Sequence, residues 1–365
     1  MEDLLRYTPS RAAVLTVSPF LSQKFFKRNP GLTEEICAQQ AAQELGCPAS
    51  SILPAAVQGA SSFTVTRSDA RPGDLGVVQF RDLSSPLSRD TMALARRTYG
   101  HVIPACEVVT CGLGDKAHVY LMTLAGGIAF SAAQRNLYQD EGAERLTVTV
   151  ADFASFVASS LSTARQNTDD ALLSQAYEQL AAWEAALPAR FQPKLAEVRA
   201  RLPVILGRQF PQVLNHADLV EMNIQVDDAS GGIAGIVDWE NASYGAFGVA
   251  IASLEVLLGI CTGGGVWIWH PRQERLRAVF YETLCAELGR YLEGRHLDAD
   301  DVEAARVFGL FVMYGAWAAS GADGHDGDGD GRGAALAAVC LEAGLGEGAA
   351  AQPFLRRYWG DRRLT

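Results

Sequence analysis

One short stretch constrains the fold of this chain more than any other. Residues 214–240 read LNHADLVEMNIQVDDASGGIAGIVDWE. Two apolar segments, 224–226 and 233–237, flank a polar, glycine-containing turn, and this pattern predicts a β-hairpin. Asn223 precedes the first strand and Asp238 follows the second, so we expect both side chains at the same end of the hairpin.

The polar side chains around this hairpin are those that phosphoryl transfer needs. That reaction requires a positioned hydroxyl, a bound metal ion and neutralised phosphate oxygens, with little covalent chemistry from the protein. Asp218 is the candidate that accepts or orients the proton of an attacking hydroxyl. Asn223 and Asp238 offer oxygen ligands to Mg²⁺, which needs one or two from the protein when phosphates and water supply the rest. His216 is interpreted as a hydrogen-bonded structural residue, because Asp218 already provides the base.

The predicted elements describe a small sheet region followed by a mainly helical one. A helix is expected from Thr33 to Leu45, where Gly46 ends it. The strand signals that follow surround one further helix; the strands are 61–67, 75–81, 106–112 and 117–124, and the helix is 86–99. After Gly126 and Gly127 the pattern becomes helical apart from the hairpin. Helices are expected at 147–166, 169–206, 246–260, 272–294, 298–320 and 333–344.

The length of the chain favours two lobes of the α+β class. A single hydrophobic core rarely grows past about 250–300 residues, and this chain has 365. We therefore expect an N-terminal lobe, residues 1–124, with an antiparallel sheet and a preceding helical segment. The second lobe, residues 125–365, is expected to be mainly helical and to carry the catalytic loop and the acceptor site.

Composition argues against several classes of partner. The formal net charge of −11 disfavours nucleic acid, since phosphate-backbone binding needs a basic face. The seven cysteines are scattered without a C-x-x-C pair and are expected to be free thiols. The N-terminus lacks the apolar core of a secretion signal, so a cytoplasmic protein is expected. Two apolar runs, 246–261 and 305–320, fall short of the roughly 20 residues that cross a bilayer; they are interpreted as buried helices, and no membrane partner is expected.

Residues 321–333, GADGHDGDGDGRG, are the one low-complexity segment. The alternating aspartates suggest, as an alternative, a calcium loop that starts at Asp326. The twelfth position of such a loop, where an EF-hand has a bidentate glutamate, is Ala337, so a surface loop is the favoured interpretation. The histidines outside the hairpin stretch show no metal-ligand spacing, and a zinc enzyme is not expected.

The segments HADLVEMN and GIVDWE resemble the H-x-D-x-x-x-x-N and metal-aspartate motifs of the aminoglycoside phosphotransferase and choline kinase family. Upstream, QGASSFTV resembles the first hairpin of that family, VVQFR its third strand, RRTYGHVIP the segment after its first-lobe helix, and VYLMTLAGG its interlobe linker. The resemblance covers roughly residues 35–285 and is closest to the large fungal branch. It implies a two-lobed protein-kinase-like fold in which residues 1–124 form the nucleotide-binding lobe.

The resemblance also implies roles for individual residues. Asp218 would be the catalytic base, braced by His216, and Asn223 and Asp238 would hold Mg²⁺. Arg81 would contact the α- and β-phosphates of ATP. The other nucleotide contacts would come from the turn over the phosphates and from the segment beside adenine; they are Gly59, Ala60, Ser61, Ser62, Met122 and Leu124.

The chain departs from the family pattern in three places. Ala217 stands where glycine is usual between the histidine and the aspartate, which is acceptable if the backbone there does not need positive φ. No aspartate follows the hairpin before Glu255, and the helix acid expected to pair with Arg81 is not evident, with Asp90 as the candidate. Glu240 and Glu255 are candidates for the acceptor pocket, although Glu240 is equally well explained as a carboxylate at a helix start.

The predicted function is that of an ATP- and Mg²⁺-dependent kinase of a small-molecule hydroxyl, or less readily of an amine, acting in a cleft between the lobes. The alternative is a kinase-fold protein with another role, because a fold does not fix a function. Such a protein would be a non-phosphorylating enzyme acting on a natural product, or a ligand-binding pseudokinase. The expected partner is a small molecule in either case, with the acceptor and the oligomeric state left open.

Overall fold

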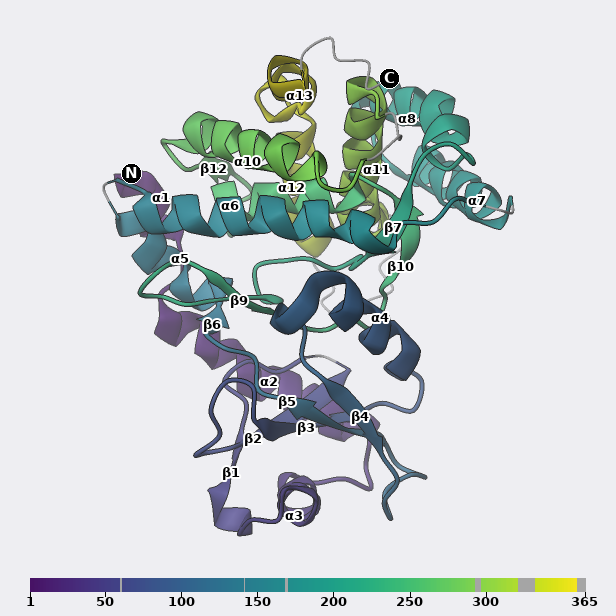
Figure 1. Cartoon of the computed structure of the whole chain (residues 1–365). Coiled ribbons are helices and arrows are strands. Elements are labelled where there is room, and N and C mark those ends of the chain that lie inside the picture. Colours follow the sequence, from purple (N-terminus) through teal and green to yellow (C-terminus); the bar gives the residue numbers. More distant parts are fainter. Residues whose placement is uncertain (60, 141, 168–169, 293–296, 321–331, 360–365) are drawn as a thin grey trace. The chain divides into compact units, whose positions relative to one another are not determined.

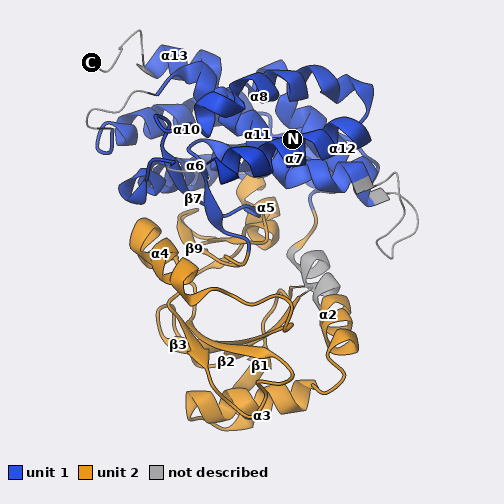
Figure 2. Ribbon diagram, turned by 90° about the vertical axis from the view of Figure 1, so that its right-hand side faces the viewer, with its two compact units in different colours: residues 1–8, 140–220, 241–365 blue, residues 9–139, 221–240 orange. Residues whose placement is uncertain are grey.

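The computed structural model describes the chain except for residues 60, 141, 168–169, 293–296, 321–331 and 360–365, and except for the side chains of residues 11–19, 320, 332 and 359 (Figure 1). The chain forms two compact units (Figure 2). The sheet unit comprises Pro9–Gln139 and Glu221–Glu240, and the helical unit comprises Met1–Thr8, Asp140–Val220 and Asn241–Thr365. The calcium loop considered at Asp326 lies outside the described residues.

The sheet unit is built on a five-stranded antiparallel sheet with the strand order β1-β2-β3-β5-β4. Its strands are β1 Ile52–Pro54, β2 Ser62–Arg67, β3 Leu75–Arg81, β4 Cys106–Val109 and β5 His118–Thr123. The helices of this part are α2 Arg11–Arg28, α3 Glu34–Leu45 and α4 Arg89–Tyr99, with the short η1 Ala49–Ser51 and η2 Gly100–Val102. The predicted strands and helices are confirmed, except that the strand predicted over 106–112 ends at Val109 and that α4 begins after Pro86. Ser88 caps it instead, accepting a hydrogen bond from the backbone N–H of Thr91 at 3.2 Å.

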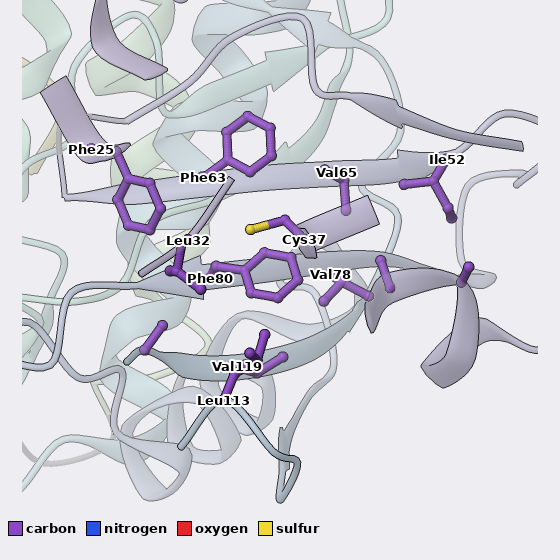
Figure 3. Close-up of a cluster of buried hydrophobic side chains, with 13 residues drawn as sticks. Phe25, Leu32, Cys37, Ile52, Phe63, Val65, Val78, Phe80, Leu113 and Val119 are labelled. Atoms are coloured by element: carbon purple, nitrogen blue, oxygen red, sulfur yellow. The ribbon is translucent and has the colours of Figure 1, made fainter. Parts of the chain in front are cut away.

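Alternation along the strands places a hydrophobic core on one face of this sheet. Phe63 of β2 lies opposite Phe80 of β3 in the ladder, and both are buried together with Phe25 of α2 and Cys37 of α3 (Figure 3). Side chains two residues apart on a strand point to the same face, which is why Val65 joins the same cluster. The two helices therefore cover this face of the sheet through a continuous apolar contact.

The opposite face of the same strands is polar. Ser62 pairs with Arg81 and Thr64 pairs with Gln79 across β2 and β3. The side-chain amide of Gln79 donates to the Thr64 hydroxyl at 3.2 Å, and its Oε1 accepts from Nη1 of Arg81 at 3.0 Å. The two-residue period of the strand therefore directs Arg81 away from the hydrophobic core.

The predicted hairpin of residues 224–237 is confirmed as β8 Ile224–Val226 and β9 Ile233–Ile236, which pair antiparallel. Asp227 stabilises the turn between them. Its Oδ1 accepts hydrogen bonds from the backbone N–H groups of Ala229 and Ser230 at 3.0 and 2.8 Å. These hydrogen bonds favour the ionised carboxylate and lower the pKa of Asp227, with the bond from Ser230 as the largest cause.

A short strand explains where the sheet unit ends. β6 Ile128–Ala129 pairs with β8 and leads into α5 Phe130–Gln139. Gly127, just before β6, has a φ of 76°, and a Cβ there would lie 2.3 Å from the carbonyl oxygen of Val226. Only glycine allows this close approach. The compact unit consequently includes the hairpin and continues past Leu124, where the sequence placed the lobe boundary.

The helical unit contains most of the long helices. They are α6 Glu144–Ser159, α7 Ala171–Ala186, α8 Gln192–Ile205, α10 Gln273–Leu288, α11 Ala299–Ser320 and α12 Arg332–Leu345, with the shorter α1 Glu2–Tyr7, α9 Leu254–Leu258 and α13 Gln352–Trp359. Single turns occur at η3 Ser160–Thr163, η4 Ala189–Phe191, η5 Val249–Ser253 and η6 Glu347–Ala349. Two antiparallel ribbons complete the unit: β7 Gln212–Asn215 with β10 Ser243–Ala246, and β11 Gly259–Cys261 with β12 Trp267–Trp269.

Some of these helices carry long apolar stretches. By length and composition, Glu144–Thr163 and Ala299–Ala319 could each cross a membrane, as could the bent pair of α12 and α13 if it counts as one span. In the structure α6 packs against α10, where the rings of Phe153 and Phe280 lie 5.7 Å apart, and α11 packs against α8 and α12. The apolar run 305–320 is helical as predicted, but it belongs to an apolar stretch of 21 residues, Ala299–Ala319, which is longer than the sequence argument assumed. Half of the most apolar part of this stretch is buried inside the protein.

Three helix predictions are wrong in detail. The helix predicted over 272–294 ends at Leu288, and residues 293 and 294 lie outside the described part of the chain. The helix predicted over 169–206 is divided into α7 and α8, because Pro188 lacks a backbone N–H and disfavours helical geometry for the residue before it. The segment predicted as a helix over 246–260 contains η5, α9 and the start of β11. Gly248 precedes η5 with a φ of 103°, and Gly259 ends α9 in an extended conformation.

Candidate active site

The predicted catalytic loop follows β7 in the helical unit. β7 pairs with β10, so that Ser243 lies opposite Asn215, the residue before His216. His216 is buried at 2% exposure, whereas Asp218 is exposed. A buried imidazole can support the loop, and an exposed carboxylate is accessible to a substrate; the roles of the two residues stay predictions.

A small apolar pocket lies beside this loop. His216 and Ala217 line it together with residues of α11, among them Met313. Gly309 of α11 allows a close approach of the helix, since a Cβ there would lie 2.2 Å from the carbonyl oxygen of Val249. The cavity volume of 10 Å³ has room for about one water molecule. The pocket is therefore packing space behind the loop and is too small for an acceptor.

Ala217 lies in the left-handed region of backbone conformation, with a φ of 66°. A Cβ in this region approaches the following carbonyl oxygen and costs roughly 1–2 kcal/mol, whereas glycine adopts the conformation freely. Alanine would replace the usual glycine without strain only if φ were negative here, and φ is positive.

Ala217→Gly is expected to raise the free energy of unfolding by about 0.5–1 kcal/mol, because relief of the strained Cβ exceeds the added freedom of the unfolded chain. Urea denaturation measures the change. Ala182→Gly, at an exposed position inside α7, is the matched control and should lower stability by about 1 kcal/mol. If both variants lost stability equally, the strain at Ala217 would be refuted.

Asn223 and Asp238 lie at the same end of the β8–β9 hairpin. Ile224 is paired with Ile236, and the backbone N–H of Val237 donates to the carbonyl oxygen of Asn223 at 3.0 Å. Asp238, the next residue, has a φ of 65°. Aspartate enters this region more readily than most non-glycine residues, and residues held in it are concentrated at functional sites.

This end of the hairpin fits a magnesium ion held together with nucleotide phosphates. An amide oxygen and a carboxylate are hard oxygen ligands, and Mg²⁺ in nucleotide sites takes one or two carboxylates while keeping phosphates and water. The side chain of Asp238 is 38% exposed, which leaves it accessible to such a ligand. Across the described parts of the chain, no group of three or more His, Cys, Asp or Glu side chains could form an all-protein metal centre.

Arg81 connects this hairpin end to the five-stranded sheet. Its Nη1 lies 3.2 Å from Oδ1 of Asp238, and its Nε donates to the carbonyl oxygen of Ser85 at 2.9 Å. Nη2 contacts the carboxylate of Glu240 and lies 3.4 Å from the hydroxyl of Ser61. A guanidinium group at 1% exposure thus bridges the metal candidate Asp238 and a second carboxylate.

The second acid beside Arg81 is Glu240 and not Asp90. Asp90 is exposed in the first turn of α4, and among the described contacts the carboxylates that pair with Arg81 are those of Asp238 and Glu240. Burial raises the pKa of the Glu240 carboxyl, although the neighbouring charge of Arg81 acts in the opposite direction. The Asp90 prediction is wrong because the partner comes from a distant part of the chain.

The turn predicted to lie over the phosphates is tight. A Cβ on Gly59 would lie 2.8 Å from the hydroxyl of Ser62, which is 4% exposed at the start of β2. The hydroxyl of Ser61 contacts the guanidinium group of Arg81, as described above. Ala60 lies outside the described residues. Phosphate contacts by this turn stay a prediction.

The segment predicted to lie beside adenine continues from β5. Met122 is 9% exposed and is paired with Cys106 of β4. The backbone N–H of Leu124 donates to the carbonyl oxygen of Asp74 at 2.8 Å. The backbone is therefore ordered by the sheet and the β2–β3 turn, and the adenine contacts stay a prediction.

Glu255 is buried among charges of the helical unit. Its side chain is 1% exposed, and its two oxygens contact the guanidinium group of Arg277, with Oε1 at 3.0 Å from Nη1. Oε1 also lies 3.4 Å from Nη1 of Arg306. A carboxylate enclosed by two guanidinium groups does not support the predicted contact with an acceptor. Glu255 is therefore assigned to the packing of the helical unit and not to the active site.

Ser85 was missed by sequence reasoning. Its hydroxyl contacts Glu240 and its carbonyl oxygen accepts from Arg81, yet it lies in a segment between β3 and α4 without strand or helix periodicity. The contact between Gln79 and Arg81 could have been predicted, because Gln79 lies two residues before Arg81 and therefore on the same face of β3.

The fold is shared with solved structures of small-molecule kinases. The chain is similar to a choline kinase from Cryptosporidium parvum (14% identity, TM-score 0.51, 84% of this chain and 93% of that chain covered). It is also similar to an ethanolamine kinase from Plasmodium vivax (11% identity, TM-score 0.51, 84% and 88% covered). A Ralstonia eutropha protein provisionally assigned as an aminoglycoside phosphotransferase gives 12% identity and a TM-score of 0.53, with 80% and 91% covered. These likenesses establish the two-lobed, α+β protein-kinase-like fold that the sequence predicted.

Sequence comparison identifies the family directly. No curated protein matches the chain significantly. Residues 54–255, more than half of the chain, match the phosphotransferase enzyme family, APH. The matched region contains the HADLVEMN and GIVDWE motifs and the strand that ends at Arg81. The chain therefore belongs to the phosphotransferase enzyme family.

Proposed function

We propose that this protein transfers the γ-phosphoryl group of ATP, bound with Mg²⁺, to a hydroxyl group of a small molecule. One observation carries the proposal: Asn223 and Asp238 share one end of the β8–β9 hairpin, and the guanidinium group of Arg81 contacts Asp238 there. Oxygen ligands for a metal beside a cation for phosphate oxygens are what phosphoryl transfer requires. The family of the chain supports the same reaction class.

Each residue has one task in this proposal. Asn223 and Asp238 would hold Mg²⁺, which would neutralise charge on the transferred phosphate. Arg81 would neutralise the α- and β-phosphate oxygens. Asp218 would accept the proton of the acceptor hydroxyl as that oxygen attacks, and His216 would hold the loop that carries Asp218. The remaining nucleotide contacts would come from Gly59, Ser61, Ser62, Met122 and Leu124.

Nucleotide binding and turnover test the proposal. ATP with Mg²⁺ at about 100 times its Kd should raise the melting temperature by a few degrees, because a ligand that binds only the folded state stabilises it. ATP with EDTA should raise it less. A panel of hydroxyl compounds that includes choline, ethanolamine and aminoglycosides should then reveal an acceptor that accelerates ADP release. Neither a shift nor ADP release with any acceptor would defeat the proposal.

A second candidate is a kinase-fold protein that binds its ligand without phosphorylating it, or that acts on a natural product by another reaction. One observation favours it: all three guanidinium nitrogens of Arg81 are already engaged by protein groups, so a phosphate would have to displace some of them. Binding of Mg·ATP without turnover on any acceptor would favour this candidate.

We further propose a cytoplasmic protein of the fungal branch of the family, with an acceptor from secondary metabolism. The described cysteines are all free thiols, which fits a reducing compartment. The acidic net charge of −11 supports a small molecule as partner in place of nucleic acid, and the proposal includes no membrane partner.

A further inference from the structure

Glu240 lies two residues after Asp238, and three groups of the sheet unit hold its carboxylate. Oε2 contacts Nη2 of Arg81 and lies 3.5 Å from the hydroxyl of Ser61. Oε1 accepts a hydrogen bond from the hydroxyl of Ser85. These contacts fix the carboxylate against the guanidinium group, and they leave the side chain 21% exposed.

Arg81 depends on carboxylates because a buried cation needs a counter-charge. Asp238 and Glu240 supply it. The other acids near the end of β3 are not in position to do so. Asp90 is exposed on α4, and Asp82 forms an ion pair with an arginine of α2 at 2.9 Å.

The proposed reaction would treat these two carboxylates differently. A carboxylate that holds Mg²⁺ shares its charge with the metal, so Asp238 would neutralise Arg81 less fully. We propose that Glu240 is the positioning residue of Arg81: it keeps the guanidinium group in place for the phosphates of ATP while Asp238 binds the metal, and Ser61 and Ser85 orient its carboxylate. This inference rests on the proposed function and replaces the acceptor contact predicted for Glu240 from the sequence.

The affinity of the full-length protein for Mg·ATP, measured by calorimetry, tests this role without knowledge of the acceptor. Glu240→Ala should weaken the affinity about tenfold to a hundredfold, the range expected for a hydrogen bond between charged groups. Glu240→Gln keeps a hydrogen-bonding side chain without the charge and should weaken it less, about threefold to tenfold. Asp90→Ala is the matched control, since it removes an exposed carboxylate of the same unit, and should change the affinity less than about twofold.

A double-mutant cycle separates positioning from structural damage. If Glu240 acts through Arg81, then Glu240→Ala added to Arg81→Ala should weaken Mg·ATP binding no further. A structural defect would weaken binding equally in both backgrounds. Circular dichroism checks that each variant is folded. If Glu240→Ala does not fold, the cycle is measured with Glu240→Gln in its place.

The outcomes distinguish this inference from the proposed function. Wild-type protein that binds no Mg·ATP would overturn the proposed function, and the role of Glu240 with it. Two results would overturn the role of Glu240 alone: unchanged affinity in Glu240→Ala, or additive effects in the cycle. Coupled losses with an unchanged Asp90→Ala control would establish the role.

Discussion

Asp218→Asn is expected to lower kcat by about two to four orders of magnitude, the contribution of a positioned general base, while leaving the affinity for Mg·ATP within about twofold. The amide cannot accept the proton of the acceptor hydroxyl. Nucleotide affinity should persist because the groups proposed to bind it, Arg81 among them, belong to the sheet unit, whereas Asp218 belongs to the helical unit. Steady-state kinetics at saturating ATP and acceptor gives kcat, and calorimetry gives the affinity.

The control for this variant is Asp170→Asn. Asp170 is an exposed aspartate of the same unit at the start of α7, and its side chain makes no capping hydrogen bond. The same chemical change there should leave kcat unaltered. An unaltered kcat in Asp218→Asn would remove Asp218 from the chemistry, and a large loss of nucleotide affinity would show that the variant acts on structure instead.

The parts of the fold that depend on local signals could be predicted from the sequence. Thr33 caps α3 by accepting from the backbone N–H of Ile36 at 3.2 Å, and Gly46 ends it with a φ of 61°. Both signals lie within a few residues of the structure that they determine. The β8–β9 hairpin is predictable for the same reason, since its apolar strands and polar turn are contiguous, and its geometry brings Asn223 and Asp238 to one end.

The parts that depend on distant contacts could not be predicted. Arg81 and Glu240 are 159 positions apart, and they meet only because the fold brings the end of β3 to the end of the hairpin. No periodicity of β3 or of the hairpin encodes that meeting. The same reason explains Ser85, whose contact with Glu240 spans 155 positions.

Ala217 shows what a family pattern can and cannot predict about one residue. The resemblance identified the position as one where glycine is usual, and it made the φ angle the deciding quantity. That angle is 66°, and the identity of the side chain alone does not give it. The position could therefore be selected from the sequence, whereas the strain had to be found in the structure.

Glu255→Ala is expected to lower the free energy of unfolding by about 3–5 kcal/mol, the loss typical of one partner removed from a buried ion pair. Arg277 and Arg306, exposed at 0% and 1%, share this carboxylate. Arg306 would keep its ion pair with Glu303 at 2.7 Å, but Arg277 would keep no carboxylate among its described contacts. Its remaining partners are Gln273, at 2.9 Å, and the ring of Trp269, 5.0 Å below its guanidinium group.

Urea denaturation of Glu255→Ala distinguishes the structural role of this residue from the acceptor contact predicted from the sequence. Glu197→Ala removes a carboxylate that is 63% exposed and paired with Lys194, and it should change stability by less than about 1 kcal/mol, as expected for a surface ion pair. Glu255→Gln, which keeps the hydrogen-bonding shape without the charge, should fall between the two. A Glu255→Ala protein as stable as wild type, with a raised KM for its acceptor, would instead mean that the carboxylate reaches substrate. The charge network linking α9, α10 and α11 would then be a minor part of the stability of the helical unit.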